Sequence, residues 1–211
     1  MTFVPADQSN PLFCGFRVLD SLVEHDLGPG MGFLEHPDKD NEMVTYVEEG
    51  ALIHGDSVGR AGRLRAGEFR RTSTPGGMII RAINKSRSER AHVFQSGIAS
   101  GQNHPRPGGE QKRFSLAERR GLLRLIASPD GREGSLRIHE DVRMYSSLLY
   151  RGTHLIHEIG AGRRGWLHVV AGRIRLVEHC LGAGDGVGLA DEVAVSFTAQ
   201  EPSEILLFDL P

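Results

Sequence analysis

The sequence predicts an all-β protein, a sandwich or a barrel, built from two related β domains, and three observations support this prediction. Short runs of alternating apolar and polar residues, rich in β-branched side chains, recur along the chain. Glycines separate these runs at close intervals, and the chain holds 27 of them in 211 residues. Short motifs also recur in the same order in the two halves, which indicates an internal repeat.

The runs that fit strands best alternate in hydrophobicity and are bounded by turn residues. They cover residues 43–47, 148–150, 167–170, 174–177 and 205–208. The sequence offers one good helix, from Ser115 to Leu125, in which Ser115 is the expected N-cap and Glu118 completes a capping-box spacing. The turn-rich segment 100–109 precedes this helix and is the best candidate for a linker.

The evidence for the repeat is that similar segments occur in the same order in both halves, although few of their residues are identical. The matching pairs are 46–50 with 168–172, 66–68 with 183–185, and 89–94 with 201–206. Each half therefore contains an apolar strand that ends in glycine, an Ala-Gly-acid turn, and a final apolar strand behind a charged turn. Two related β domains explain this order most simply, and a single irregular β protein is the alternative.

Charge and composition narrow the function classes. The net charge is −2 and the sequence pI is near 6.6, so no direct nucleic-acid binding is expected. No stretch approaches the roughly 18 apolar residues of a membrane span, and no membrane partner is expected. The start of the chain lacks a signal-peptide pattern, and its two cysteines, Cys14 and Cys180, form no CxxC motif. These features favour a reduced, cytoplasmic location.

Two short motifs resemble those of the cupin superfamily. The first consists of a glycine, five residues, His-x-His, a glutamate and a further glycine. The residues at its positions are Gly30, His36, Asp38, Glu42 and Gly50. The second motif, Pro-x-Gly-x-x-His-x-x-x-Asn, corresponds to Pro75–Asn84, with Ile80 in place of the histidine.

Further stretches are similar to the pirin family in particular. They lie at residues 36–50, 54–57, 128–136 and 206–211. The resemblance extends over about residues 15–211, which is nearly the whole chain. It implies two cupin barrels (double-stranded β-helices, or jelly rolls) packed side by side, with an N-terminal domain over 1–112 and a C-terminal domain over 113–211.

The resemblance also implies one iron-type metal ion in the N-terminal barrel, bound by His-x-His of the first motif and His-x-Glu of the second. Carried over, these positions are His36, Asp38, Ile80 and Ala82. His36 is retained and Asp38 offers an oxygen donor, but the side chains of Ile80 and Ala82 cannot bind a metal. Because alternate residues of a strand face the same side, Ile80 and Ala82 are expected to face the barrel interior together. We therefore expect no catalytic residue, no cofactor and no metal.

Weaker candidates come from both halves. Glu42, together with His36 and Asp38, forms an alternative site for one weakly held iron or other divalent transition metal. The arginines of residues 60–71 are interpreted as solvated strand faces and loops. In the second half, no His-x-His motif is present, and four histidines are interpreted as packed or hydrogen-bonded residues: His154, His157, His168 and His179.

Two functions of different classes stay open. In the first, the chain is a pirin relative with a degenerate metal site that binds a small molecule or a protein partner and catalyses nothing. In the second, it is a metal-dependent oxygenase of the quercetin 2,3-dioxygenase type that uses His36, Asp38 and Glu42. The residues favour the first, because Ile80 and Ala82 hold no donor where the family has ligands.

Overall fold

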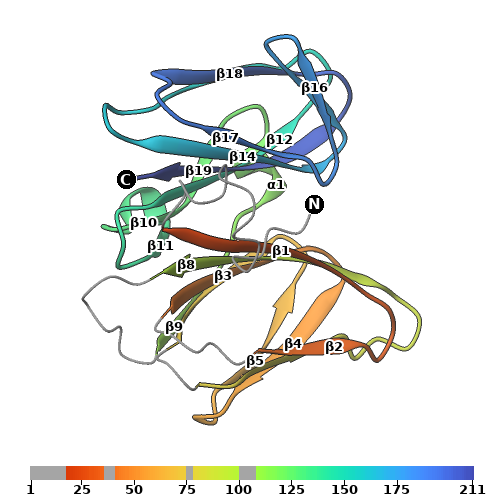
Figure 1. The fold of residues 1–211 in the computed structure, drawn as a ribbon. Helices are drawn as coiled ribbons and strands as arrows, with labels where there is room; N and C mark the ends of the chain where they lie inside the picture. Colours follow the sequence, from red (N-terminus) through yellow and green to blue (C-terminus); the bar gives the residue numbers. More distant parts are fainter. Residues whose placement is uncertain (1–17, 36–40, 75–77, 100–107) are drawn as a thin grey trace, which may run out of the picture. The chain divides into compact units, whose positions relative to one another are not determined.

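The computed structural model describes residues 18–35, 41–74, 78–99 and 108–211, and nearly all of its regular structure is strand (Figure 1). Contacts divide the described chain into two compact units, Leu19–Phe114 and Ser115–Pro211. Among these residues, no helix is long and apolar enough to cross a membrane. The prediction of an all-β protein is therefore confirmed.

The N-terminal unit consists of two antiparallel sheets with a core between them. One sheet has the strand order β1-β8-β3-β6-β9, and the other has the order β2-β7-β4-β5. Val47 and Val93 from the first sheet pack with Leu52 from the second in this core. The strands are β1 (Leu19–Leu27), β2 (Gly32–Glu35), β3 (Asn41–Glu49), β4 (Ala51–Asp56), β5 (Ala61–Arg65), β6 (Glu68–Thr74), β7 (Ile80–Ile83), β8 (Ala91–Ala99) and β9 (Gly108–Arg113).

The C-terminal unit is also built from two sheets around an apolar core. Their orders are β11-β10-β12-β19-β14-β17 and β13-β18-β15-β16. Leu167 and Leu207 from the first sheet pack with Phe197 from the second. The elements are α1 (Leu116–Arg119), β10 (Arg124–Ser128), the 3-10 turn η1 (Arg132–Gly134), β11 (Leu136–Arg137), β12 (Arg143–Leu149), β13 (His154–Glu158), β14 (Arg164–Ala171), β15 (Arg173–Leu176), β16 (His179–Gly182), β17 (Gly186–Leu189), β18 (Ala194–Ala199) and β19 (Ser203–Leu210).

The two units repeat one strand order, which confirms the internal repeat. The series β1-β8-β3-β6 corresponds to β12-β19-β14-β17, and β2-β7-β4-β5 corresponds to β13-β18-β15-β16. The equivalent strands β3 and β14 are irregular at the same place, where the register shifts between Val47 and Glu49 and between Val169 and Ala171. The two halves are therefore related strand by strand, which allows single residues to be compared between them.

The glycines that end β3 and β14 show why this part of the repeat is kept. Gly50 and Gly172 adopt positive φ angles of 76° and 77°, which favour glycine. A Cβ at Gly50 would lie 2.2 Å from the carbonyl oxygen of Arg90, and one at Gly172 would lie 2.2 Å from that of Pro202. Any larger residue at Gly50 or Gly172 would collide with the neighbouring backbone at Arg90 or Pro202 and force the two segments apart.

The helix expected from Ser115 to Leu125 is much shorter in the structure. Its capping box is present, because Ser115 Oγ accepts a hydrogen bond from the Glu118 N–H and the Glu118 carboxylate accepts one from the Ser115 N–H. Helix α1 nevertheless ends at Arg119, and Gly121 then adopts a positive φ of 66°. Residues 124–128 form β10, because pairing with β12 satisfies their backbone hydrogen bonds within the sheet.

Several predicted features lie outside the described residues. These are Cys14, His36, Asp38, Pro75 and the linker over 100–107. The second cysteine, Cys180, is exposed and free. The compartment of the protein therefore stays a prediction from the sequence.

A histidine joins three strands of the first N-terminal sheet and makes its stability depend on pH. On β8, His92 Nε2 lies 2.7 Å from Glu24 Oε1 on β1, and His92 Nδ1 lies 3.2 Å from Glu48 Oε2 on β3. The hydrogen bond to Glu48, opposed by burial and supported by Glu24, raises the pKa of His92 to about 9. The charged imidazole therefore stabilises the folded state, and this contribution is present below the ordinary histidine pKa of 6.5.

We expect the N-terminal unit to lose stability as the pH rises from about 6.5 through about 9, because His92 then loses its proton in the folded state. Urea denaturation followed by circular dichroism at several pH values in this window measures the effect. His92→Gln should flatten the dependence. An equally steep dependence in that variant would assign the loss to another group.

Candidate functional site

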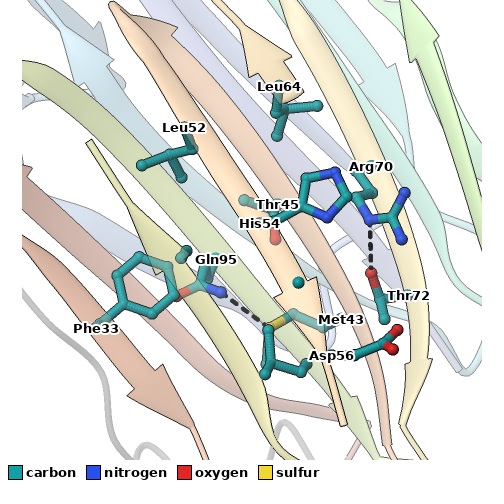
Figure 2. Close-up of a pocket in the computed structure, with 13 residues that line it drawn as sticks. Phe33, Met43, Thr45, Leu52, His54, Asp56, Leu64, Arg70, Thr72 and Gln95 are labelled. Carbon is teal, nitrogen blue, oxygen red and sulfur yellow. Dashed lines mark hydrogen bonds between the residues drawn. The ribbon is translucent and has the colours of Figure 1, made fainter. Parts of the chain in front are cut away.

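The N-terminal unit holds a pocket between its two sheets (Figure 2). The pocket has about 450 Å³ of empty space when its open mouth is included, and the centre of a water molecule fits in about 20 Å³ of it. One water needs roughly 10–15 Å³ on this measure, so the pocket holds one or two water-sized groups unless its lining side chains move. Its lining residues are Phe33, Met43, Thr45, Leu52, His54, Gly55, Asp56, Leu64, Arg70, Thr72, Ile80, Ala82 and Gln95.

Polar side chains occupy positions in this pocket whose equivalents in the C-terminal barrel are apolar. Thr45 on β3 pairs with Gln95 on β8, and the equivalent pair on β14 and β19 is Leu167 with Leu207. The same register makes three further pairs equivalent: His54 with Leu176, Arg70 with Val187, and Thr72 with Leu189. Each of these C-terminal residues belongs to the apolar core of its barrel or packs against it. The N-terminal barrel therefore has a band of polar side chains at positions that are apolar in the C-terminal barrel.

His54 is held over a glycine and has one ring nitrogen without a partner. A Cβ at Gly62, its cross-strand neighbour on β5, would lie 2.7 Å from His54 Nε2, so the absence of a side chain there makes room for the ring. The buried Nε2 atom has no hydrogen-bond partner. Burial, and secondly the positive charge of Arg70, lower the pKa of His54 to about 4, although a hydrogen bond to Gln111 acts to raise it. The imidazole is therefore neutral near pH 7.

Arg70 is a half-buried guanidinium beside this imidazole (Figure 2). Its Nε donates a hydrogen bond to Thr72 Oγ1 at 3.2 Å. Its Nη2 lies close to Gly109, where a Cβ would be only 2.7 Å away, so the guanidinium needs glycine at that position. Within the described part of the chain, no carboxylate lies within ion-pair distance of Arg70. Burial and then the charge of Arg60 lower its pKa. The sequence-based interpretation of this arginine as a solvated residue is therefore wrong.

Two other arginines of the 60–71 stretch, Arg60 and Arg71, differ from Arg70 because each has an acidic partner. Arg60 Nε lies 2.7 Å from Asp56 Oδ2, and Arg71 Nη1 lies 3.8 Å from Glu42 Oε1. Asp56 also accepts hydrogen bonds from the backbone N–H groups of residues 58 and 60, which fixes its carboxylate in the turn after β4. Arg70, unlike these two, has no carboxylate within ion-pair distance among the described residues, although the charge of Asp56 acts on it from farther away.

Gln95 is a buried amide whose two ends are both engaged. Its Oε1 lies 2.6 Å from His25 Nε2, and its Nε2 donates to Met43 Sδ at 3.0 Å. The His25 ring stacks on Phe33 with ring centroids 4.2 Å apart. Burial lowers the pKa of His25. Gln95 is therefore positioned from both sides and presents a fixed polar surface to the pocket.

The two lost ligand positions face the pocket, as strand alternation predicts. Ile80 and Ala82 on β7 line it, whereas Arg81 between them is exposed. Ile80 packs with Met43 and Met78 in a small buried apolar cluster. No donor atom from either position therefore reaches the pocket.

Glu42 lies on the opposite face of β3 from the pocket. Met43 and Thr45 line the pocket, so alternation directs Glu42 away from it. Its carboxylate is fully buried and accepts a hydrogen bond from Ser73 Oγ at 3.4 Å, with Arg71 beside it. Glu42 therefore does not line the pocket, and because His36 and Asp38 lie outside the described residues, the alternative site that combines the three stays a prediction.

The four histidines of the C-terminal half do not converge on one site. His154 Nδ1 lies 3.0 Å from Thr198 Oγ1, and His157 Nε2 lies 3.2 Å from Asp209 Oδ2. His168 is buried in β14, and His179 is exposed at the start of β16. Across the described residues, no group of three or more His, Cys, Asp or Glu side chains is placed to hold a metal ion.

Sequence reasoning missed His54, Arg70 and Gln95 as pocket residues. His54 lies in a stretch similar to pirins and Arg70 in the arginine cluster, but neither pattern assigns a role. The signal that could have found them is the repeat itself. Aligning the halves through Gly50 and Gly172 places His54 opposite Leu176, and polar residues that replace apolar ones mark a cavity.

The chain is similar to solved and curated bacterial proteins over its whole length. A crystal structure of YhhW from Escherichia coli matches with a TM-score of 0.89 and 38% identity, covering 99% of this chain and 88% of that one. A curated Escherichia coli protein named quercetin 2,3-dioxygenase is 38% identical over 210 residues, which is 100% of this chain and 90% of the relative. A pirin-like protein of Caulobacter vibrioides is 32% identical and covers 88% of this chain and 80% of its own length.

The prediction that no cofactor is used is wrong by this comparison. YhhW, 38% identical to this chain, was also crystallised in complex with nickel(II), and this points to a metal cofactor. The described residues at two of the family's ligand positions do not fit such a metal, because Ile80 and Ala82 contribute no donor and Ile80 packs in an apolar cluster. The other two positions, His36 and Asp38, lie outside the described residues.

Family-level matches cover both halves of the chain separately. Residues 2–98 match the pirin family, and residues 125–210 match the quercetinase C-terminal cupin domain. The described residues from Leu19 to Ile98 and from Leu125 to Leu210 in these regions each lie within one unit of the structure, and the two units share one strand order. With relatives more than 30% identical over nearly the full length, the chain belongs to the pirin family as a protein of two cupin domains.

Proposed function

We propose that the N-terminal barrel binds a small organic molecule with oxygen substituents in the pocket of Figure 2. The observation that carries this proposal is the polar band of Thr45, His54, Arg70, Thr72 and Gln95, whose C-terminal equivalents are all apolar. Concave sites with an apolar wall and a few fixed polar groups are typical of small-molecule binding.

The stability of the barrel gives a physical reason for this interpretation. A buried polar group without a partner costs about 1–3 kcal/mol, whereas a leucine at the same place would stabilise the core. His54 Nε2 is such a group. A ligand that offers a hydrogen bond to His54 and a negative oxygen to Arg70 would offset the cost of both.

Thr45→Leu is the sharpest test, because it introduces into the pocket the residue found at the equivalent position 167. We expect it to abolish ligand-induced thermal stabilisation, which should reach about 2.7 kcal/mol in the parent chain at a ligand concentration of 100 Kd. Quercetin and salicylate serve as probes. Arg81→Leu, on the outer face of β7, is the matched control and should keep the parent response. Equal stabilisation of the Thr45→Leu variant would place binding elsewhere.

A second candidate function is oxygenation of a flavonol, and the comparisons favour it. Relatives carry the name quercetin 2,3-dioxygenase, and the bacterial pirin YhhW was crystallised with nickel(II). The described pocket wall lacks two of the family's donors, at Ile80 and Ala82. We therefore expect the oxygenase activity of the parent chain to be limited by how well it holds the metal.

Restoring the donors tests this second candidate. Ile80→His with Ala82→Glu should raise nickel-dependent oxygen uptake in the presence of quercetin at least tenfold, and should make the melting temperature rise with added Ni²⁺. Elemental analysis reports the metal content of both proteins. A double variant that binds nickel but consumes no oxygen would reject the oxygenase function for this chain.

A further inference from the structure

We propose that the pocket selects an organic acid, and that it holds a carboxylate or enolate oxygen at Arg70 and a neighbouring hydroxyl group at His54. This proposal deepens the small-molecule function above and rests on it. The ligand class would be a compact hydroxy acid, such as an ortho-hydroxybenzoate or a short 2-hydroxy acid. The argument comes from charge, hydrogen-bond direction and the space available.

Charge favours an anion at Arg70. Arg60 and Arg71 are paired with Asp56 and Glu42, so their charges are largely balanced. Arg70 makes one hydrogen bond to the neutral hydroxyl of Thr72, and among the described residues it has no ion-pair partner. A planar guanidinium offers parallel N–H donors to a carboxylate, and such bonds are stronger when water is partly excluded.

Hydrogen-bond direction makes His54 an acceptor. Gln111 Nε2 donates to the carbonyl oxygen of Arg63 at 2.9 Å and lies 3.1 Å from Glu68 Oε2, which uses both of its hydrogens. The Gln111 side chain also hydrogen-bonds the His54 ring in a way that favours protonation of the ring, so its carbonyl oxygen accepts from a ring N–H. Since Nε2 has no partner, the ring donates through Nδ1 and keeps the lone pair on Nε2. The Nε2 atom is covered by Gly62 and has almost no accessible surface, so a ligand hydroxyl group reaches this lone pair only when the ring or the Gly62 backbone shifts.

The space decides the size of the group that enters. The centres of water-sized groups fit in about 20 Å³ of the pocket, so a carboxylate or hydroxyl end enters without rearrangement, whereas a larger group requires the lining side chains to move. Phe33, Leu52 and Leu64 line the same pocket and offer apolar contact to the carbon part of the ligand. An acid with a hydroxyl on the adjacent carbon presents its two oxygens from one end, and His54 and Arg70 lie next to each other in the pocket (Figure 2).

Three probes separate these contributions in calorimetric titrations of the full chain. Salicylate carries both groups, benzoate lacks the hydroxyl, and salicylamide replaces the carboxylate by a neutral amide. We expect salicylate to bind at least tenfold more tightly than salicylamide and at least threefold more tightly than benzoate. Arg70→Met should remove the preference for the acid over the amide. Arg81→Met removes an equal charge from the exposed face of β7 and should leave all three affinities unchanged.

Two further variants keep the test decisive if Arg70→Met is poorly folded. Arg70→Lys retains the charge without the planar fork and should retain part of the preference for salicylate. His54→Leu, which copies position 176 of the C-terminal barrel, should abolish the preference of salicylate over benzoate. Binding of salicylamide as tight as that of salicylate, with both lost in Thr45→Leu, would overturn the acid proposal and leave the small-molecule function intact. If no probe, including quercetin, bound in a manner sensitive to Thr45→Leu, both proposals would fall.

Discussion

Asp209→Ala is expected to destabilise the C-terminal barrel by about 3–5 kcal/mol, because it removes a buried carboxylate on which the partly buried side chains of Arg143, His157 and Arg163 converge. The Asp209 carboxylate is buried in β19 and accepts from His157 Nε2 at 3.2 Å and from Arg163 Nε. Arg143 Nη1 approaches it at 3.4 Å. Three chain segments therefore meet on one carboxylate, and its removal affects all of them.

Trp166, the single tryptophan, lies buried in β14 of the same barrel, so its fluorescence reports this unfolding directly. Asp141→Ala is the matched control, because Asp141 also pairs with Arg163, at 2.6 Å, but is largely exposed. We expect the control to cost less than about 1 kcal/mol. Equal losses in the two variants would mean that burial does not set the strength of this cluster.

The same carboxylate gives the C-terminal barrel a dependence on acid pH. Burial alone would raise the pKa of Asp209, but hydrogen bonds from His157 and Arg163 and the charge of Arg163 outweigh it and hold the pKa below 3.8. Its contribution is therefore present above the ordinary carboxyl pKa and is lost as the pH falls through the lower folded value. Asp209→Asn should flatten the loss of stability in this acid range.

Glu204→Ala is expected to cost a similar amount, about 3–5 kcal/mol, for the same physical reason in another place. Arg119 Nη1 donates to Glu204 Oε1 at 2.8 Å and to Ser146 Oγ at 3.2 Å, and the arginine is only 2% exposed. Removing the glutamate leaves a guanidinium buried without its carboxylate. Tryptophan fluorescence during urea denaturation measures the loss.

A double replacement separates the pair from its isolated charges. Arg119→Met with Glu204→Leu fills the same volume without charge and should recover most of the stability lost in Glu204→Ala. The exposed pair Arg132–Asp130 offers the comparison, because its members are 46% and 60% exposed and its removal should cost little. If the double variant were as unstable as the single one, shape and not charge would explain the loss.

The sequence predicted the fold well because the repeat and the strand period are local patterns. The inward direction of Ile80 and Ala82 followed from alternation alone, and the structure places both in the pocket. The prediction that the helix continues beyond Arg119 was wrong, because the pairing of β10 with β12 is a long-range interaction that no capping signal reports.

The candidate site was harder to predict, because its residues come from strands that are far apart in the chain. Glu42 matches the family motif by spacing, yet its strand turns it to the opposite face from Met43 and Thr45. His54 and Arg70 become neighbours only when β4 and β6 face one another across the barrel. The two side chains fit at these places because Gly62 and Gly109 have no side chain of their own and leave room for them.

The place of β19 in its sheet also has a consequence for how the chain is synthesised. This strand lies between β12 and β14, and its pairing with β12 joins residues as far as 66 positions apart. The sheet therefore stays open until residue 210 has left the ribosome, whereas the equivalent strand of the N-terminal barrel, β8, ends at Ala99. The N-terminal half can complete its central pairing first. The half-made C-terminal domain meanwhile exposes the unpaired edges of β12 and β14, and this interval is when the protein is most open to aggregation.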